Sequence, residues 1–485
     1  MTPLPVHRHE ITLAPDPARV IIRPFIPGEE KRIATIIGRA LALTEDELQS
    51  ALATVRAQFD SRHFDIEGVL RHHYRKILPH LFTERPLSES RQLLIGALFS
   101  GEYALESAAL FNPSIVPHPD QSDLAEGALR FILSLRAIGE GHISSIEFRS
   151  GVIMADGAIT VDPVSHYLTE PELLPNPAYR KRAFLAKMGE ICRGNGHCST
   201  VFDTLGDYFT LSELRKVIAT VRAEETPRAR ALHRTLERIE WLAASNYELR
   251  FPACLDMSAR IIFPVSPNES NGIEDARFVR FANEDGSFIY YASYTAYNGR
   301  TILPQLLETR DFLNFRVLTL SGSAVQNKGM ALFPRRIHGE FLMLSRQDDE
   351  NIYLMRSHDP HHWDDPVLLM RPAGMWEAVK IGNCGSPIET AAGWLMITHG
   401  VGPMRRYCIG AALLDLEDPS KVIGRLNRPL LEPEGNEREG YVPNVVYSCG
   451  ALVHAGRLIL PYGLSDRAAA IVSLSLDELL AHLVS

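Results

Sequence analysis

The sequence Gly272-Ile273-Glu274-Asp275-Ala276-Arg277 places two adjacent carboxylates and an arginine at the start of a predicted strand. It follows the turn-forming residues 266–271 and precedes residues 278–281, in which apolar and basic side chains alternate as in a half-buried strand. Taken alone, the segment favours a solvated turn in which Arg277 makes only a weak surface pair. Its position in a repeating pattern reverses that interpretation.

Four segments share a polar or glycine-containing opening, an apolar strand, a turn and a second strand. They begin at Gly272, Asn327, Gly382 and Val442, so the successive spacings are 55, 55 and 60 residues. An opening at Gly141 fits the same period once an insertion of about 75 residues is removed. Five copies of a four-stranded unit predict a mainly β fold, a five-bladed β-propeller.

Two helical regions interrupt this pattern. Residues 28–136 have helical periodicity, with a capping box formed by Thr44 and Glu47. Further helices are predicted over 66–81, 88–99, 103–110 and 123–137. The predicted organisation is a helical N-terminal region over 1–136 and a propeller domain over 137–485, with a helical insertion at about 166–240.

The composition excludes several classes of protein. A net charge of −9 over 485 residues argues against a nucleic-acid binder, because no excess of basic side chains is available to neutralise phosphates. The N-terminus lacks an apolar signal core and no segment approaches the roughly 18 apolar residues of a membrane span, so a cytoplasmic protein without membrane contact is expected. Cys192, His197 and Cys198 lack the second half of a zinc site, so no metal is expected.

In a propeller the first strand of every blade lines a central channel, so the openings of these strands converge on one pocket. Each of the cations Lys328, Arg346 and Lys380, taken alone, is equally compatible with a solvated surface position. Because they come from successive blades, a shared site is favoured. The predicted convergent set consists of His142, Ser144, Ser145, Glu274, Asp275, Arg277, Lys328, Lys380, Asn383 and Asn444, with Arg346 and His399 at the ends of second strands.

One acidic pair facing several cations suits phosphorolysis of a glycosidic bond better than hydrolysis. An inverting hydrolase needs two carboxyl groups, an acid for the leaving oxygen and a base for water. Phosphate is already a nucleophilic anion, so a phosphorylase needs only the acid, with cations to hold the phosphate in line. Lys328, Arg346 and Lys380 are the cations that the pattern offers.

The motifs around these residues resemble those of glycoside hydrolase family 130, whose first motif is Gly-x-Glu-Asp-Pro-Arg. The resemblance is strong over residues 245–475, plausible for the blade near Gly141 and absent from the first 135 residues. It implies a five-bladed propeller that acts on β-mannosides, in most members as a phosphorylase and in some as a β-1,2-mannosidase. The matching segments are 272–277, 327–334, 344–346, 376–382, 387–394, 399–401 and 410–419.

The resemblance also implies roles for several site residues. Asp275 resembles the catalytic acid, which protonates the glycosidic oxygen through the 3-hydroxyl of the mannosyl residue. The implied phosphate-binding residues are Lys328, Arg346, Lys380, Ser144, Ser145 and His399. The convergence of the strand openings gives Glu274, Arg277, Asn383 and Asn444 as substrate-binding residues, and the resemblance adds Tyr297. Tyr290, Tyr294 and Trp376 could stack on sugar faces, although aromatic residues in strands belong more often to the core.

Three hypotheses follow. The first is an inverting β-mannoside phosphorylase that binds a β-mannoside oligosaccharide, needs no cofactor beyond inorganic phosphate as co-substrate, and releases α-mannose 1-phosphate. The second is a β-mannosidase, for which Glu389, Glu434 or Glu437 could supply a base. The third is a non-catalytic sugar-binding propeller. In each case the apolar stripes of the N-terminal helices could form a homo-oligomer or cover the propeller itself.

Two departures from the family pattern concern the site. Ala276 stands where the family has proline, which loosens the turn after Asp275, and Lys328 stands where an arginine is frequent. The long helical insertion separates the first blade from the second and could overhang the pocket, so it could alter which acceptor sugar fits.

Overall fold

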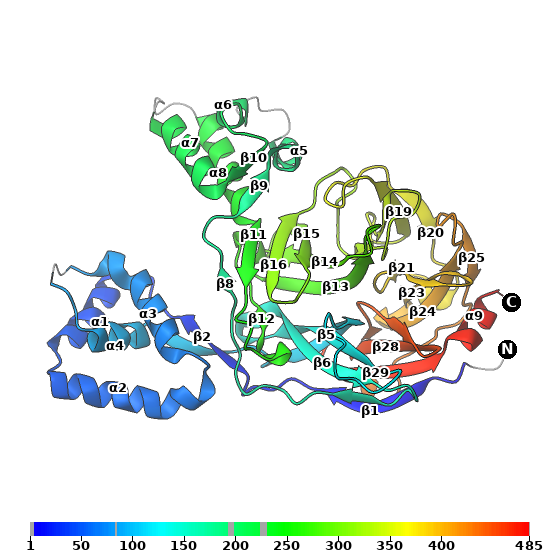
Figure 1. Ribbon diagram of the computed structural model, residues 1–485, viewed down its shortest axis with the longest axis horizontal. Coiled ribbons are helices and arrows are strands. Elements are labelled where there is room, and N and C mark those ends of the chain that lie inside the picture. Colours follow the sequence, from blue (N-terminus) through cyan, green and yellow to red (C-terminus); the bar gives the residue numbers. More distant parts are fainter. Residues whose placement is uncertain (1–3, 83–84, 193–197, 224–229, 485) are drawn as a thin grey trace.

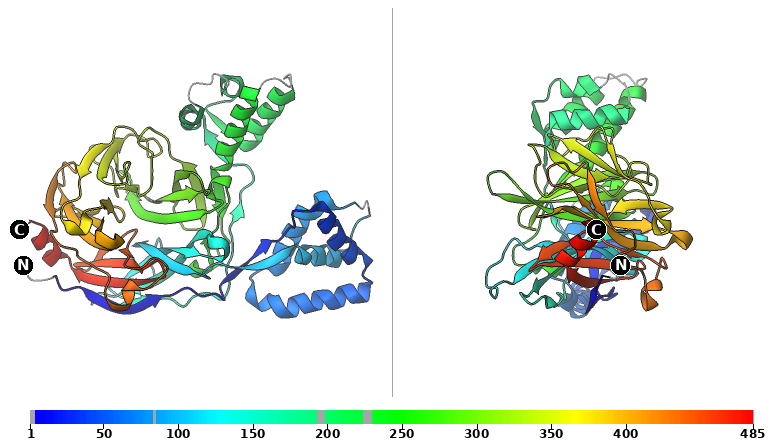
Figure 2. Two further views of the ribbon diagram at one scale, coloured as in Figure 1. Left: turned by 180° about the vertical axis from the view of Figure 1, so that it is seen from behind. Right: turned by 90° about the vertical axis from the view of Figure 1, so that its right-hand side faces the viewer.

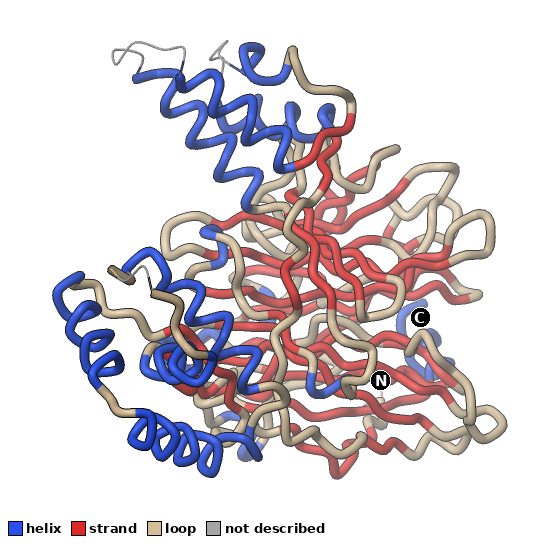
Figure 3. The backbone as a smooth tube through the Cα atoms, turned by 60° about the vertical axis from the view of Figure 1, so that its left-hand side comes forward, coloured by secondary structure: helices blue, strands red, loops and turns tan. Residues whose placement is uncertain are grey.

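The computed structural model describes residues 4–82, 85–192, 198–223 and 230–484. The protein is mainly β, and two helical regions project from the β region (Figures 1 and 2). The tube view separates the same parts by colour, with most of the strands gathered in one body and most of the helices in two outlying places (Figure 3). Most of the described strands belong to five antiparallel groups, numbered 1 to 5 in chain order.

The bounds of the five groups follow the chain. Group 1 contains β4 (Ala109–Pro117), β5 (Leu129–Ile138), β6 (Ser144–Ile153) and β7 (Ile159–Val161). Group 2 contains β13 (Gly272–Ala282), β14 (Phe288–Tyr297), β15 (Ile302–Thr309) and β16 (Asn314–Thr319). Group 3 contains β17 (Ala331–Leu332), β18 (Phe341–Ser345), β19 (Ile352–Ser357) and β20 (Val367–Met370).

The last two groups complete the β region. Group 4 contains β21 (Lys380–Asn383), β22 (Ile388–Thr390), β23 (Gly393–Val401), β24 (Tyr407–Leu414) and β25 (Val422–Arg425). Group 5 contains β26 (Val446–Tyr447), β27 (Leu452–His454), β28 (Arg457–Leu464), β29 (Ala468–Ser475) and the N-terminal β1 (His7–Leu13). Because β1 pairs with β29, an N-terminal strand completes the last group of the chain.

Group 1 contacts both group 2 and group 5. Gly272 at the start of β13 pairs with Ser144 at the start of β6 in parallel, which links groups 1 and 2 in one sheet. The first strand of the group, β4, contacts both β13 and β28. Strand β4 therefore lies next to groups 2 and 5. The sequence pattern predicts the opening of the first copy at Gly141, but Gly141 precedes β6, which is the third strand of group 1.

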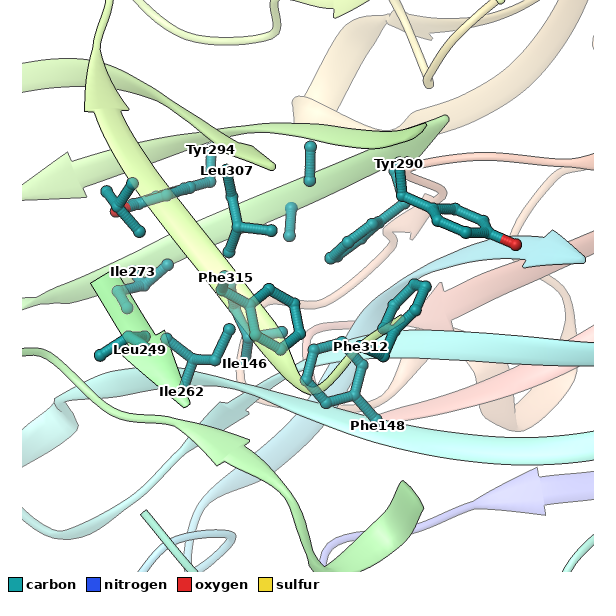
Figure 4. Packing of buried hydrophobic residues seen from close by; sticks show 14 of the residues in the cluster. Ile146, Phe148, Leu249, Ile262, Ile273, Tyr290, Tyr294, Leu307, Phe312 and Phe315 are labelled. Carbon is teal, nitrogen blue, oxygen red and sulfur yellow. The ribbon is translucent and has the colours of Figure 1, made fainter. Parts of the chain in front are cut away.

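An aromatic core fixes group 1 against group 2 (Figure 4). Phe148 of β6 lies 5.7 Å from Phe312 and 6.1 Å from Phe315 between ring centroids, and 6.0 Å from Phe278 of β13. All four rings are almost completely buried, and each such side chain contributes about 1.5–3 kcal/mol to stability. This packing sets the position of β4 and β5 relative to the start of β13.

The first helical region lies between β2 (Val20–Pro24) and β3 (Ser100–Ala104), which pair with each other as an antiparallel ribbon. The capping box predicted at Thr44 is present, with both of its hydrogen bonds. The helices of this region are α1 (Glu30–Ala42), α2 (Glu45–Phe59), α3 (Ile66–Ile77) and α4 (Glu89–Leu98).

The predicted helices over 103–110 and 123–137 are wrong, because these residues contribute to β3, β4 and β5. The middle of β5 is buried on both faces, and an apolar run of that kind lacks the alternation that distinguishes a strand from a buried helix. The helical region consequently ends at Leu98, earlier than the predicted boundary at 136, and β1 belongs to the β region.

The second helical region lies between β7 and β13 and has its own apolar core. Its helices run from Lys181 to Ala244, close to the predicted insertion, and they are α5 (Lys181–Cys192), α6 (Cys198–Phe202), α7 (Leu211–Ala223) and α8 (Arg230–Ala244). Glu190 of α5 accepts a hydrogen bond from the Gly322 amide next to group 3. The short strands of this part are β8 (Glu172–Leu173), β9 (Ala178–Arg180), β10 (Tyr208–Thr210), β11 (Tyr247–Arg250) and β12 (Ile261–Ile262).

The C-terminal helix α9 (Leu476–Val484) packs against β24, β25 and β29. None of the described helices is long and apolar enough to cross a membrane.

A buried ion cluster anchors the segment that leads from β1 to the first helical region. Arg19 contacts Glu106 at 2.6 Å and Glu147 at 3.0 Å, and Arg149 contacts the same carboxylates at 2.7 and 3.0 Å. The four side chains are at most 5% exposed. Loss of one member would leave an uncompensated buried charge, which costs about 3–5 kcal/mol.

We expect His361 to make the stability of the contact between groups 2 and 3 depend on pH. Its imidazole contacts Glu308 at 2.7 Å and Asp359 at 3.1 Å. Burial opposes the charged form, but the two carboxylates outweigh it and raise the pKa of His361 to about 9. Since the folded pKa exceeds the usual value of 6.5, this stabilisation is complete below pH 6.5 and is lost as the pH rises towards 9.

The change to test is His361→Gln. It should lower the free energy of unfolding by about 1–3 kcal/mol at pH 6, measured by urea denaturation, and the difference from the unchanged protein should shrink towards pH 9. His358→Gln is the matched control, because His358 is 83% exposed and lies 3.9 Å from its nearest carboxylate. A constant difference across this range would contradict the assignment.

Candidate active site

A β-bulge at the start of β13 positions the predicted acid. The pairing of β13 with β14 shifts register between Glu274 and Arg277, and Asp275 within the bulge has the left-handed φ of 54°. A bulge turns a side chain away from the direction that regular alternation would give it. Ala276 after it is 6% exposed, so the position where the family pattern has proline is packed in the core.

Two residues of group 1 hold the paired carboxylates. Asn112 of β4 donates a hydrogen bond through Nδ2 to Asp275 Oδ1 at 2.8 Å. Arg136 of β5 lies with Nη2 at 2.8 Å from Glu274 Oε1 and with Nη1 at 3.6 Å from Asp275 Oδ1. Lys328, which precedes β17, contacts Glu274 Oε2 at 3.2 Å. The acid is therefore held by groups 1 and 2 together and lies next to a lysine from group 3.

These contacts make Asp275 an ionised carboxylate. Burial raises its pKa, but the charges of Arg136, Arg277 and Lys328 and the hydrogen bond from Asn112 outweigh burial, so the pKa of Asp275 lies below its usual value. Asp466, in the β28–β29 turn, behaves in the opposite way. Burial and the nearby charge of Asp275 raise the pKa of Asp466 to about 6, although Arg136 opposes the rise.

A second cluster contains two of the predicted phosphate-binding cations. Arg346 follows β18 and is 6% exposed, and its Nη1 lies 3.0 Å from His399 Nε2. Lys380 at the start of β21 contacts Asp349 Oδ2 at 3.0 Å, and Arg346 Nε lies 3.5 Å from Asp349 Oδ1. We name Arg346, His399, Lys380 and Asp349 the cation cluster.

His399 is a neutral member of the cation cluster. Burial and the charges of Arg346, Arg277 and Lys380 hold its pKa well below the usual 6.5. Because arginine can only donate, Nε2 of the neutral ring accepts from Arg346 and Nδ1 carries the proton, on the side of Cys384 Sγ at 3.9 Å. His399 therefore orients Arg346, and this nitrogen is not free to donate to an anion.

A buried arginine and tyrosine lie between the two clusters. Arg277 is 3% exposed and donates a hydrogen bond to the Tyr447 hydroxyl from β26. The Tyr447 ring in turn lies 4.9 Å from the His399 ring between centroids. Arg277 also lowers the pKa values of both Asp275 and His399, so one guanidinium influences the acid and the cation cluster together.

The other predicted site residues occupy varied positions. Ser144 and Ser145 are buried at the start of β6, and Ser144 lies directly against Gly272. Asn383 is buried in β21, and its amide donates to the Gly385 carbonyl at 3.4 Å. Asn444 has a φ of 63° and accepts from Arg438 at 2.8 Å. Tyr297 is half-buried at the end of β14, where it pairs with Gly272.

The centre of the β region contains buried polar atoms without a hydrogen-bond partner. Such atoms are rare in proteins, and a group of them around charged residues suits the binding of a polar ligand rich in oxygen. Those in the site residues are Asn112 Oδ1, Arg136 Nε, Ser144 Oγ, Ser145 Oγ, Arg277 Nε, Arg346 Nε and Asn383 Oδ1.

Asn112, Arg136, Tyr447, Asp349 and Asp466 contact or influence the predicted site and were missed from the sequence. Asn112 and Arg136 lie at the edges of segments that the periodicity assigned to helices. The tripeptide Phe111-Asn112-Pro113 was the sequence signal that could have marked a break inside β4, where the pairing with β5 shifts register and Asn112 has a φ of 49°.

Several predicted candidates are not at this site. Tyr290 is buried in the core between groups 1 and 2, and Trp376 packs over Gly400 and Gly410. Tyr294 belongs to the same core but also lines the small cavity beside Asp275. Glu389 pairs with Arg335 at 2.6 Å. The remaining two candidate bases, Glu434 and Glu437, interact with Arg8 of β1.

A cavity of about 320 Å3 is lined in part by Ile115, Phe278 and Leu452 and contains none of the predicted acid or phosphate-binding residues. A smaller cavity is lined by Asp275, Arg277 and Lys328. His197, considered as a zinc ligand, lies outside the described residues. Within the described ranges, no three His, Cys, Asp or Glu side chains are grouped as metal ligands.

The fold and site define a mainly β protein in which the partly buried carboxylate of Asp275 lies near a cluster of cations. A family model described as beta-1,4-mannooligosaccharide phosphorylase matches residues 254–484. The 1,2-beta-oligomannan phosphorylase of Thermoanaerobacter sp. (strain X514) is 37% identical over 228 residues, which cover 45% of this chain and 75% of that protein. The chain therefore belongs to glycoside hydrolase family 130.

Two further similarities concern Listeria innocua. Its Beta-1,2-mannobiose phosphorylase (serovar 6a) is 32% identical over 232 residues, which cover 46% of this chain and 63% of that protein. The solved structure of a Listeria innocua beta-1,2-mannobiose phosphorylase with beta-1,2-mannobiose aligns with a TM-score of 0.45 and 20% identity, over 79% of this chain and 93% of that chain. Asn112 and Arg136 precede the segment that the family model matches.

The assignment of His399 as a neutral ring predicts a titration result. In 15N-labelled protein the His399 ring should retain the chemical shifts of the Nδ1–H tautomer from pH 8 down to pH 5, because burial and three neighbouring cations oppose protonation. The spectrum of His399→Gln identifies the signal by its loss. Protonation of His399 above pH 6 would refute the assignment.

Proposed function

We propose that this chain is an inverting β-mannoside phosphorylase, which cleaves a short β-linked mannoside with inorganic phosphate and releases α-mannose 1-phosphate. The names of its relatives support this activity, since they are phosphorylases of β-1,2- and β-1,4-linked mannosides. The observation that carries the proposal is the division of the site into one acid, Asp275, and a separate cation cluster built around Arg346 and Lys380.

The roles follow from these contacts. Phosphate binds to Arg346 and Lys380, with Lys328 on the side of the acid, and one of its oxygens forms the bond to C1 of the mannosyl residue. The glycosidic C1–O bond breaks on the opposite face, which inverts the anomeric centre. The proton of Asp275 passes through the sugar 3-hydroxyl to the leaving oxygen. Asn112 and Arg136 orient the carboxylates that surround the mannosyl residue.

The low pKa of Asp275 fits this sequence of events. In the free protein the neighbouring cations stabilise the carboxylate and thus oppose the protonated form that an acid requires. A bound phosphate brings negative charge next to Lys328, which is one of these cations, and so reduces the net positive field at Asp275. We infer that phosphate binding favours the protonated acid, so both substrates are needed before the proton is transferred.

Hydrolysis is the alternative, and one observation favours it. Asp466 is a second carboxyl group close enough to influence Asp275, and its pKa of about 6 would suit a general base near neutral pH. The three glutamates expected to serve as bases interact with arginines elsewhere. Phosphorolysis is preferred because Arg346 and Lys380 form an anion site that a hydrolase does not need.

We further propose that the five strand groups are the blades of a five-bladed β-propeller. Support comes from the succession of the groups around a common centre in Figure 1, from the contacts of β4 with β13 and β28, and from the completion of group 5 by β1. In that arrangement β4, β13 and the starts of β17, β21 and β26 surround the site. No metal or organic cofactor is proposed, and inorganic phosphate is the co-substrate.

Product analysis tests the reaction. The protein is incubated with β-1,2-mannobiose and with β-1,4-mannosyl-glucose, with and without inorganic phosphate, and the products are identified by 1H and 31P NMR. We expect α-mannose 1-phosphate only when phosphate is present. Release of free mannose at equal rates in both conditions would show hydrolysis instead of phosphorolysis. Asp466 would then be the first residue to test as the base.

Asp275→Asn tests the acid. An amide cannot supply the carboxyl proton, so kcat should fall by about 10²–10⁴-fold in protein that the thermal midpoint shows to be folded. Asp285→Asn is the matched control, because Asp285 lies in the exposed turn of the same β13–β14 hairpin and accepts only from Ser287 in the described residues. Phosphorolysis by Asp275→Asn at the rate of this control would exclude Asp275 as the acid.

A further inference from the structure

Asp349 occupies a position in the cation cluster where an anion is expected. Its carboxylate contacts Lys380 at 3.0 Å through Oδ2 and approaches Arg346 Nε at 3.5 Å through Oδ1. These are two of the cations that the proposed function assigns to phosphate. The Asp349 side chain is 51% exposed, whereas that of Arg346 is 7% exposed, so the carboxylate meets the cations from the solvent side.

The turn that carries Asp349 is fixed independently of these ion pairs. Asp349 lies between β18 and β19 with a φ of 60°. The preceding Asp348 accepts hydrogen bonds from the amides of Glu350 and Asn351, each at 2.9 Å, and from the Tyr353 hydroxyl at 2.8 Å. Because Asp348 holds the backbone, the half-exposed side chain of Asp349 can leave the cations by rotation alone.

Arg346 does not depend on Asp349 for its orientation. His399 Nε2 lies 3.0 Å from Arg346 Nη1 on the buried side, and the neutral imidazole holds the guanidinium without competing for its charge. Arg346 Nε, although buried, has no hydrogen-bond partner, because Asp349 approaches only to 3.5 Å. A better-placed acceptor at this nitrogen would gain a hydrogen bond that Asp349 does not make.

We propose that Asp349 is a positioning residue that neutralises Arg346 and Lys380 in the free protein and competes with phosphate for them, so that it sets the affinity for phosphate. The inference rests on the proposed function. An incoming phosphate dianion repels the carboxylate and needs the same donors, so Asp349 rotates into solvent when phosphate binds. The phosphate group of mannose 1-phosphate meets the same competitor in the synthetic direction.

The test replaces the carboxylate by its neutral isostere, Asp349→Asn. Removal of the competing charge should lower the KM for inorganic phosphate by about three- to tenfold, which corresponds to the loss of one or two exposed ion pairs. The KM for the mannoside should stay the same, and the effect should fall on KM rather than on kcat. Titration calorimetry with inorganic phosphate alone should show the same gain in affinity.

Glu350→Gln is the matched control, because it removes the same charge from the same turn and, among the described residues, Glu350 pairs with neither cation. It should change the KM for phosphate by less than about twofold. Asp349→Ser provides a second variant, and the thermal midpoints of all variants report whether they are folded.

The possible outcomes distinguish a failure of the role of Asp349 from a failure of the proposed function. An unchanged or higher KM for phosphate in Asp349→Asn, or an equal decrease in Glu350→Gln, overturns the role of Asp349 and leaves the phosphorylase in place. A protein whose turnover does not depend on phosphate, and which binds none by calorimetry, overturns the proposed function and this inference with it.

Discussion

The bulge at Asp275 is the local constraint on which the candidate site depends. Asp275 and Ala276 of β13 stand opposite a single residue of β14, Tyr294. The left-handed backbone of Asp275 directs its carboxylate towards Asn112 of group 1. Arg136 contacts the neighbouring Glu274 from the same group. The bulge is useful only because an aromatic core fixes groups 1 and 2 against each other, so the site is a property of the packed sheets and not of β13 alone.

The electrostatics of the site separate the carboxylates of Glu274 and Asp275 from the cation cluster. Arg277 is buried between them and lowers the pKa values of both Asp275 and His399. His399 orients Arg346 while uncharged, which avoids placing a further positive charge in a buried position next to three cations. The positive charge of Arg346 and Lys380 is available to be balanced by an anionic ligand, and Asp349 partly balances it on the solvent side.

The sequence predictions were successful for the two helical regions and failed for the first strands of the β region. The helices at 30–98 and 181–244 have amphipathic stripes, because one face packs on a small core while the other meets solvent. The periodicity failed at β4 and β5, whose residues are buried on both faces and show no alternation. That error concealed Asn112 and Arg136, although the motif at Asp275 was evident from the first.

The sequence by itself showed the family and predicted Asp275, Lys328, Arg346 and Lys380 as site residues, because the short motifs that contain them can be read along the chain. Only the tertiary structure decided which residues surround that motif. Asn112 and Asp275 are 163 residues apart in the chain, and Arg277 and Tyr447 are 170 apart. The tertiary structure also showed Asp349 between two cations and gave His399 its neutral state, since burial and the sum of neighbouring charges fix a pKa and neither can be read along a chain.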